Sequence, residues 1–171
     1  MTAWRLLRTG PGAPGFNMGL DQALMEDVGA GTVLRLYGWD PPALSIGWFQ
    51  PAEALVASAR EAGVGLVRRP TGGGAIHHDR ELTFCIAGSP GEDGYPAERR
   101  AAYTWVHQVL RDALATVGVE LGFRGGDAPL STRPRDGTLC FEDITAFDLV
   151  DRQGRKVVGS AQRLRGGRVL H

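Results

Sequence analysis

The chain has 171 residues, of which 43% are hydrophobic, and this length and composition suit one compact domain over residues 1–171 with a substantial core. Lysine and arginine number 19 together and balance 19 acidic residues, so no overall field draws the protein to nucleic acid or anionic lipid, and any anion site has to be local. No segment approaches the roughly 20 apolar residues of a membrane span, and the first ten residues lack an apolar run of signal-peptide length. Two cysteines make no disulfide framework. We therefore expect a cytoplasmic protein.

The N-terminal part predicts one helix and two strands. Residues 16–29 carry apolar side chains at helical spacing, with Asn17 as the N-cap candidate and Gly29 as the stop. Residues 32–39 and 43–49 alternate or run apolar and are separated by an Asp-Pro-Pro sequence. We therefore expect these two segments to form an antiparallel pair.

A second helix and a glycine-rich loop follow. Pro51 opens residues 51–63 at a position that favours the first helical turn, and Gly63 closes this segment. Residues 64–69 predict a strand that enters the loop, and residues 81–88 predict the strand that leaves it.

The C-terminal half begins with the most strongly periodic segment, residues 97–118, whose apolar side chains fall on one helical face. These are Ala102, Trp105, Val106, Val109, Leu110, Ala113, Leu114 and Val117. A Gly-, Pro- and Arg-rich loop at 122–137 precedes strands near 138–143, 145–151 and 156–165, with a hairpin turn signal between the last two. Strands in antiparallel runs with helices between them indicate an α+β domain, not a doubly wound parallel sheet.

The stretch "RRPTGGGAIHHDRELTF", Arg68 to Phe84, is the first candidate site. Its consecutive glycines Gly72, Gly73 and Gly74 let backbone bend sharply or approach a ligand, and preceding arginines could bind a carboxylate or phosphate. It is not a P-loop, because the Lys and Ser/Thr of that motif are missing, and not a Rossmann fingerprint, because a strand follows. An anion cradle and a structural turn both remain open.

The adjacent histidines His77 and His78 point to opposite faces of an extended segment, so they would not share a metal ion, and we expect no metal site. His77 fits a non-functional position. His78, with Asp79 beside it, is the better candidate for a polar role in a site.

The two cysteines have different surroundings. Cys85 lies inside an apolar strand, where a small buried thiol is the usual occupant. Cys140 follows the arginine-bearing loop and precedes "FED", a setting in which partial exposure and a lowered thiol pKa are plausible. A catalytic and a packing role for Cys140 both remain open on this reasoning.

Lys156 is the only lysine in the chain, beside 18 arginines, which hints that a compact ammonium is needed at that position. The residues Gly159, Ser160 and Ala161 that follow it are small, as in a strand that runs close beneath a ligand.

Taken in order, "NMGLDQAL", "PPALSIGWFQ", "RRPTGGGAIHHDRELTF" and "GRKVVGSAQRLR" resemble the lipoate protein ligase and octanoyltransferase superfamily, which also includes biotin protein ligases. The resemblance runs from about Trp4 to His171. It implies an α+β fold with a mixed, largely antiparallel sheet and packed helices.

The resemblance also implies a site at the glycine loop. The residues expected to contact the acyl carboxyl end or an acyl adenylate are Arg69, Thr71, Gly73, Gly74, Ala75 and His78, joined by Gly159, Ser160 and Ala161. Lys156 matches the family's lysine, which would polarise the acyl carbonyl or hold the adenylate phosphate.

Two chemistries use this scaffold. Cysteine-dependent transferases take octanoyl from acyl carrier protein, hold it as a thioester and need no cofactor, whereas ligases activate free lipoate with ATP and Mg²⁺. Both deliver the acyl group to a lysine of a lipoyl-carrier domain, in 2-oxoacid dehydrogenase complexes or the glycine cleavage H protein. "LCFED" is similar to the cysteine segment of one transferase subgroup, so we expect Cys140 to form the thioester, with Lys156 as its catalytic partner.

Two departures keep alternatives open. Gly74 matches the ligase pattern, because the transferase subgroup often carries arginine there. The family also usually continues beyond "VLH" with a C-terminal helical part, so residues 1–171 are expected to lack that portion, and a non-catalytic or partner-dependent acyl-binding domain is a further alternative. Biotin ligation is more distant, since the basic glycine-arginine loop is missing.

Overall fold

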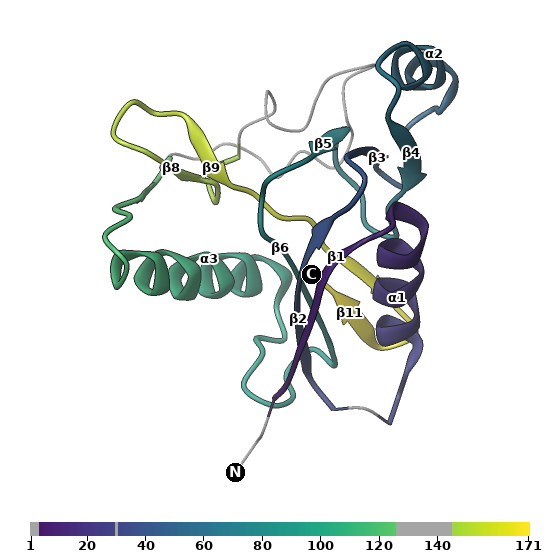
Figure 1. Ribbon diagram of the computed structural model, residues 1–171. Coiled ribbons are helices and arrows are strands. Elements are labelled where there is room, and N and C mark those ends of the chain that lie inside the picture. The colour runs from purple at the N-terminus through teal and green to yellow at the C-terminus, as the bar shows by residue number, and fades with distance from the viewer. Residues whose placement is uncertain (1–3, 30, 126–144) are drawn as a thin grey trace.

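The computed structural model describes residues 4–29, 31–125 and 145–171 (Figure 1). In that part of the chain the helices are α1 (Pro14–Glu26), α2 (Glu53–Glu61) and α3 (Arg99–Ala115). The strands are β1 (Arg5–Gly12), β2 (Val33–Trp39), β3 (Ala43–Ile46), β4 (Gly65–Arg68), β5 (Ile76–His78), β6 (Thr83–Gly88), β7 (Gly122–Phe123), β8 (Leu149–Val150), β9 (Lys156–Val158), β10 (Arg163–Arg165) and β11 (Arg168–Leu170). Among these strands six pairings are antiparallel and two are parallel, which confirms the expected α+β class.

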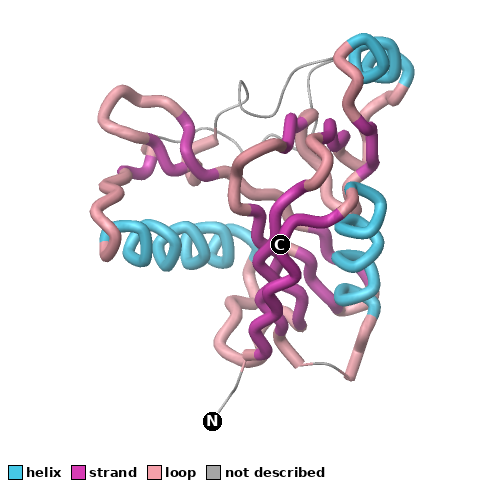
Figure 2. Tube along the Cα trace, in the orientation of Figure 1, coloured by secondary structure: helices cyan, strands magenta, loops and turns pink. Residues whose placement is uncertain are grey.

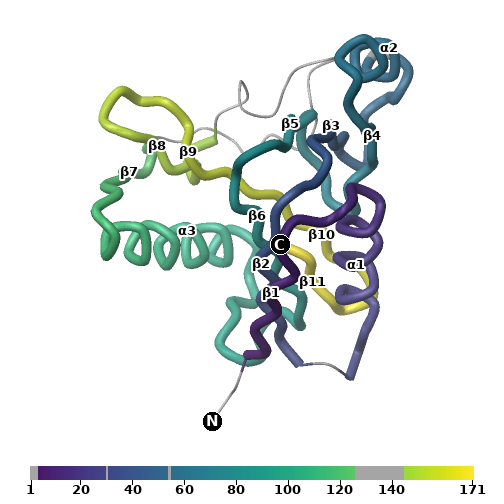
Figure 3. Tube along the Cα trace, viewed as in Figure 1, coloured from purple at the N-terminus to yellow at the C-terminus, as the bar shows by residue number. Residues whose placement is uncertain are grey.

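The central sheet has the order β1-β2-β6-β11-β10, and only β1 and β2 pair in parallel. Side chains alternate along β6, so Cys85 and Ala87 join the core cluster that contains α1, while Ile86 joins the cluster that contains α3. Figure 2 accordingly shows α1 and α3 on opposite sides of the strands. In Figure 3 the C-terminal strand β11 lies near α1, so the last residues of the chain complete a core begun by the first helix.

The expected antiparallel pairing of residues 32–39 with 43–49 is wrong. β2 is paired with β1 on one edge and β6 on the other, so neither edge is left for β3. β3 instead pairs with β4 in parallel and with β5 in antiparallel, in a second sheet of order β4-β3-β5. Because the glycine loop joins β4 to β5, β3 lies directly between the two ends of that loop.

A third small sheet, β7-β8-β9, carries Lys156. The predicted hairpin between β8 and β9 is confirmed, with Gly154 at φ 76° and the Asp151 carboxylate accepting from the backbone N–H of Arg155. The strand expected at 138–143 and most of the loop expected at 122–137 lie outside the described residues, although Gly122 and Phe123 form β7.

Helix α1 begins earlier than expected, and Asn17 is not its N-cap. Ala13 occupies the cap and Pro14 the first helical turn, where proline's fixed φ suits the helix. Asn17 is fully buried, and its Nδ2 donates to the carbonyls of Gly12 (3.1 Å) and Gly38 (2.9 Å). Its side chain therefore ties α1 to β1 and β2. Val28, one of the apolar residues in the predicted helix at 16–29, is 79% exposed beyond the end of α1.

The other helices also differ in their limits. α2 starts at Glu53, two residues after Pro51, and Gly63 follows it at φ 65°. In α3 the Glu98 carboxylate caps the N-terminus, and Ala102 and Val106 are buried as expected, but Val109 and Val117 are 49% and 73% exposed. Along α3 the hydrophobic side chains packed against the core cluster end at Leu110. None of the helices in the described ranges is long and apolar enough to cross a membrane.

Candidate functional site

The glycine loop is pressed, backbone against backbone, onto the turn that follows β3. A Cβ added to Gly47 would lie 2.0 Å from the carbonyl oxygen of Gly73, so no larger residue fits at position 47 without moving the loop. The N–H of Trp48 donates to the Thr71 carbonyl at 2.9 Å, and Gly73 has a φ of 95° that favours glycine. These contacts hold Thr71 and Gly73 against the end of β3.

The guanidinium of Arg69 lies inside the loop and binds its carbonyl groups. Nη1 donates to the backbone oxygen and to Oγ of Ser45, both at 2.8 Å. Nη2 donates to the carbonyls of Gly72 (3.0 Å) and Gly74 (2.7 Å). Arg69 is only 8% exposed, so its charge is used to shape the loop from within.

This arrangement sets the direction of two backbone N–H groups. In a planar trans peptide the C=O and N–H point in opposite directions. Since the carbonyls of Gly72 and Gly74 both point at Arg69, the N–H groups of Gly73 and Ala75 in the same peptide planes point away from it. Ala75 is fully buried and Gly73 is partly exposed, so the Gly73 N–H is the donor of this pair that an anion or carbonyl oxygen can reach.

Two further arginines hold the loop from outside. Arg68 Nη1 donates to backbone carbonyls of the turn after β3, those of Gly47 (2.9 Å), Trp48 (3.0 Å) and Gln50 (2.7 Å). Arg163 of β10 donates to the Pro70 carbonyl at 2.8 Å and lies 4.0 Å above the Trp48 ring. Arg163 therefore connects the segment that carries Lys156 to the glycine loop.

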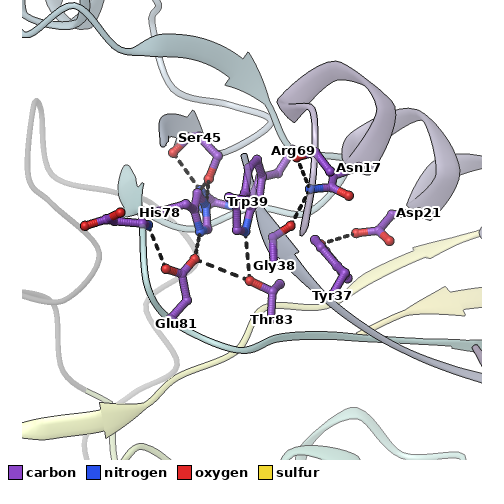
Figure 4. A network of polar contacts seen from close by, with 12 residues as sticks. Asn17, Asp21, Tyr37, Gly38, Trp39, Ser45, Arg69, His78, Glu81 and Thr83 are labelled. Carbon is purple, nitrogen blue, oxygen red and sulfur yellow. Dashed lines mark hydrogen bonds and ion pairs between the residues drawn. The ribbon is translucent and has the colours of Figure 1, made fainter. Parts of the chain in front are cut away.

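His77 and His78 do point to opposite faces, as predicted: His77 is exposed and His78 is 4% exposed. His78 Nε2 lies 2.6 Å from Ser45 Oγ, and Nδ1 lies 2.5 Å from Glu81 Oε1 (Figure 4). The indole of Trp39 stacks on the imidazole with 3.9 Å between ring centroids. The polar partner of His78 is therefore Glu81, not the neighbouring Asp79.

Burial and charge set the ionisation of this pair. Burial lowers the pKa of His78 to about 4, against the opposing effect of Glu81, so the imidazole is neutral near pH 7. Burial alone would raise the pKa of Glu81, but hydrogen bonds from the Asp79 N–H and from His78 lower it overall. A neutral imidazole thus faces a carboxylate.

Lys156 lies in a second polar cluster, with Nζ 3.0 Å from Asp148 Oδ2. Both side chains are buried, at 5% and 3% exposed. A Cβ on Gly159 would lie 2.3 Å from Lys156 Cε, so this glycine makes room for the lysine side chain. The small size of Gly159, predicted from the sequence to serve a nearby ligand, is required by Lys156 itself. The Thr145 N–H donates to Asp148 Oδ2 at 2.6 Å and fixes the counter-ion.

Ser160 joins two buried histidines beside that pair. Its Oγ lies 2.8 Å from His107 Nε2 and 2.7 Å from His171 Nε2. His107 Nδ1 contacts the Phe147 carbonyl, and His171 Nδ1 receives hydrogen bonds from Tyr95 and Gln162. Burial lowers the pKa of His171 to about 3 and also lowers the pKa of His107, so the network is uncharged near pH 7. It fixes the Gly159–Ala161 segment that accommodates Lys156.

The two cysteines differ in what the structure says of them. Cys85 is 2% exposed, and burial raises its pKa well above the usual thiol value, so the packing role predicted for it is supported. Cys140 lies outside the described residues. Within the described part of the chain no group of three His, Cys, Asp or Glu side chains is arranged to hold a metal ion.

Sequence reasoning missed several residues of both clusters. Ser45 and Glu81 become visible only when β3 and β5 pair, although the spacing of Glu81 three residues after His78 is a local signal. Asp148, His107 and His171 come from separate elements, and His107 gave no signal within an apolar helix. The structure brings together the loop residues Arg69, Thr71, Gly73, Gly74, Ala75 and His78, and separately Lys156, Gly159, Ser160 and Ala161.

Comparisons with known proteins identify the family of the chain. The chain is 41% identical to an octanoyltransferase LipM from Kyrpidia tusciae and 40% identical to one from Symbiobacterium thermophilum, over 99% of its own length in each case. It spans 64% and 63% of those proteins. A crystal structure of lipoate-protein ligase A bound with ATP superposes with a TM-score of 0.74 at 26% identity, over 97% of this chain and 63% of the other. The family model of the lipoyl protein ligase A/B catalytic domain matches residues 13–171, and the chain belongs to that family.

Proposed function

We propose that the chain transfers an octanoyl group to a lysine of a lipoyl-carrier domain through a thioester on Cys140. The observation that carries this proposal is the buried Lys156, which pairs with Asp148 and packs against Gly159. The chain that carries this lysine is 41% identical to an octanoyltransferase. A fixed ammonium in a low-dielectric position stabilises oxygen charge as it develops in acyl transfer.

The reaction would run in two steps. The Cys140 thiolate attacks the thioester carbonyl of octanoyl acyl carrier protein, a new C–S bond forms, and the carrier thiolate leaves with a proton from solvent. The ε-amine of the acceptor lysine then attacks the Cys140 thioester, an amide forms, and the Cys140 thiolate is released as the amine loses its proton. Neither step consumes a nucleotide, metal or redox cofactor.

The loop and the lysine would share the stabilisation of both tetrahedral intermediates. The N–H group of Gly73 points away from Arg69 and can donate to an oxyanion, while Lys156 supplies positive charge and the buried Ala75 supports the loop. Thr71 and Gly74 shape the loop, and Gly159, Ser160 and Ala161 support the lysine. In this proposal Arg69 and His78 act by holding the loop, and do not bind the acyl group through free side-chain donors.

The second candidate is an ATP-dependent lipoate ligase, which would use ATP and Mg²⁺ and form an acyl adenylate. The likeness to a ligase solved with ATP, and Gly74 in the glycine loop, favour it. In that reaction Lys156 would face the adenylate phosphate, and Cys140 would have no covalent role.

The two donors separate these candidates. The chain is incubated with octanoyl acyl carrier protein, or with lipoate, ATP and Mg²⁺, and is then examined by intact-mass spectrometry and pyrophosphate assay. A covalent octanoyl adduct with the first mixture, and no pyrophosphate with the second, is the expected result. Pyrophosphate release without an adduct would replace the transferase proposal with the ligase. Inactivity with both mixtures, reversed by a second polypeptide, would show a partner-dependent domain.

A further inference from the structure

Four side chains form a continuous hydrogen-bond chain behind the glycine loop, with Arg69, Ser45 and His78 buried and Glu81 partly exposed. The proposed transfer chemistry assigns no step to this chain. The hydrogen-bond chain runs from Glu81 through His78 and Ser45 to Arg69, with atom-to-atom distances of 2.5, 2.6 and 2.8 Å (Figure 4). Its members come from β3, β5, the end of β4 and the turn before β6. It therefore connects the second sheet to the loop that β4 and β5 enclose.

Each hydrogen bond in the chain has only one possible direction. The Glu81 carboxylate can only accept, so His78 carries its proton on Nδ1 and its Nε2 is an acceptor. The Ser45 hydroxyl then donates to Nε2, and the lone pairs of Ser45 Oγ accept from Arg69 Nη1. Glu81 thus determines the tautomer of His78, and the tautomer determines which way the Ser45 hydroxyl points.

The imidazole is also fixed in space. Trp39 stacks on it at an interplanar angle of 12°, and Trp39 Nε1 donates to Thr83 Oγ1 at 2.9 Å. Ser45 is 0% exposed and accepts from Arg69, so it has no access to an acyl donor. The Ser–His–Glu order therefore does not make a second nucleophile.

We propose that Ser45, His78 and Glu81 are positioning residues, which hold the Arg69 guanidinium so that the N–H group of Gly73 faces the acyl carbonyl. Arg69 follows Ser45 in this chain, and its second nitrogen fixes the carbonyls of Gly72 and Gly74. The inference rests on the acyl-transfer function proposed above. It gives His78 an indirect role in place of the expected contact with the acyl group.

The first test measures the loop itself, in the whole chain and without substrate. Hydrogen exchange of the 69–76 segment is compared among wild type, Ser45→Ala, Glu81→Ala and Glu81→Gln, with β2 as the reference segment. Loss of the serine or the carboxylate should speed exchange of loop amides about tenfold, because buried partners lose their hydrogen bonds, while β2 stays unchanged. The amide of the Glu81→Gln variant keeps a carbonyl acceptor for Nδ1 but loses the acceptor for the Asp79 N–H, so this variant should restore part of the protection.

Asp79→Ala is the matched control. Its carboxylate is 49% exposed, pairs only loosely with Arg80 at 3.8 Å, and lies two residues from Glu81 outside the chain. Only its backbone N–H, which the substitution keeps, contacts Glu81. Loop exchange in this variant should match wild type.

The second test is the rate of octanoyl transfer from the carrier protein. Ser45→Ala and Glu81→Ala should lower kcat about tenfold with KM within about twofold, because the loop donor acts on the transition state. Glu81→Gln should recover part of the lost kcat, which a general loss of stability would not do.

Unchanged loop exchange in both alanine variants, equal acceleration in β2, or failure of glutamine to restore protection would overturn the inference. Ser45→Ala changes a fully buried position and can prevent folding. The Glu81 variants then decide the test, because the Glu81 side chain is 37% exposed and its replacement leaves the core intact. If the loop responds as expected while wild type transfers no octanoyl, the positioning chain stands and the proposed function fails.

Discussion

Replacing Gly159 with alanine should displace Lys156. The new Cβ would lie 2.3 Å from Lys156 Cε and 2.8 Å from Nζ, whereas ordinary contact begins near 3.4 Å. Cε therefore has to retreat by about 1 Å. The ammonium must then leave its position 3.0 Å from Asp148, although the flexible side chain can absorb the shift without moving the backbone.

The expected effect on transfer is larger than the effect on stability. A misplacement of about 1 Å in a group that acts on the reacting atoms can cost about 100-fold in rate. The free energy of unfolding should fall by less than the about 3–5 kcal/mol that accompanies complete loss of a buried charged partner, because the ammonium stays near Asp148.

The assay is the single-turnover rate of octanoyl-enzyme formation, followed by intact mass, beside urea unfolding of the same variant. Gly122→Ala, in the small sheet that carries Lys156, is the control, since a Cβ there meets nothing within 4 Å, and it should behave as wild type. A wild-type rate for Gly159→Ala, or an equal loss in both variants, would refute the role given to the Lys156–Gly159 contact.

Three other outcomes follow from the buried polar groups. Asp148→Asn should destabilise the fold by about 3–5 kcal/mol in urea unfolding, because it removes the carboxylate that pairs with the buried Lys156 ammonium; a change below about 1 kcal/mol would contradict this. Burial lowers the pKa of His171 from 6.5 to about 3, so between these pH values the unfolded chain binds a proton that the folded chain excludes. The free energy of unfolding should therefore fall by about 2 kcal/mol between pH 6.5 and pH 5 because of this group. His171→Gln should lose that share of the pH dependence, and an unchanged slope would argue against it. Nitrogen-15 NMR should find His78 protonated on Nδ1 in the wild type and partly on Nε2 in Glu81→Ala; an Nε2 proton in the wild type would reverse the assigned direction of the chain.

Local patterns predicted the elements whose structure depends on nearby residues. The helical spacing of residues 97–118, the turn at 151–156 and the opposite faces of His77 and His78 all follow from backbone geometry over a few residues. The glycine loop was found for the same reason. The local pattern did not show what the arginines of the loop bind, a ligand or the loop itself. That depends on Ser45, which comes near Arg69 only because β3 lies between β4 and β5.

Interactions over long sequence separations explain the errors. Asn17 has the composition of an N-cap, but the carbonyl of Gly38 on β2 gives its amide a buried partner, and Pro14 starts the helix first. The apolar stripe of α3 predicts burial to Val117, whereas packing against the core cluster ends at Leu110. His107 and His171 become partners through one serine hydroxyl, and no periodicity along the sequence reports such a contact.

The central claim is the thioester on Cys140, and locating the octanoyl group tests it most directly. Wild type, Cys140→Ser and Cys85→Ser are incubated with octanoyl acyl carrier protein, and the acylated peptide is identified by mass spectrometry after a brief reaction. The account predicts a hydroxylamine-sensitive octanoyl group on Cys140 in wild type and in Cys85→Ser, and none on a thiol in Cys140→Ser, because Cys85 is buried with a raised pKa. Unchanged octanoyl transfer to a lipoyl-carrier domain by Cys140→Ser would contradict it.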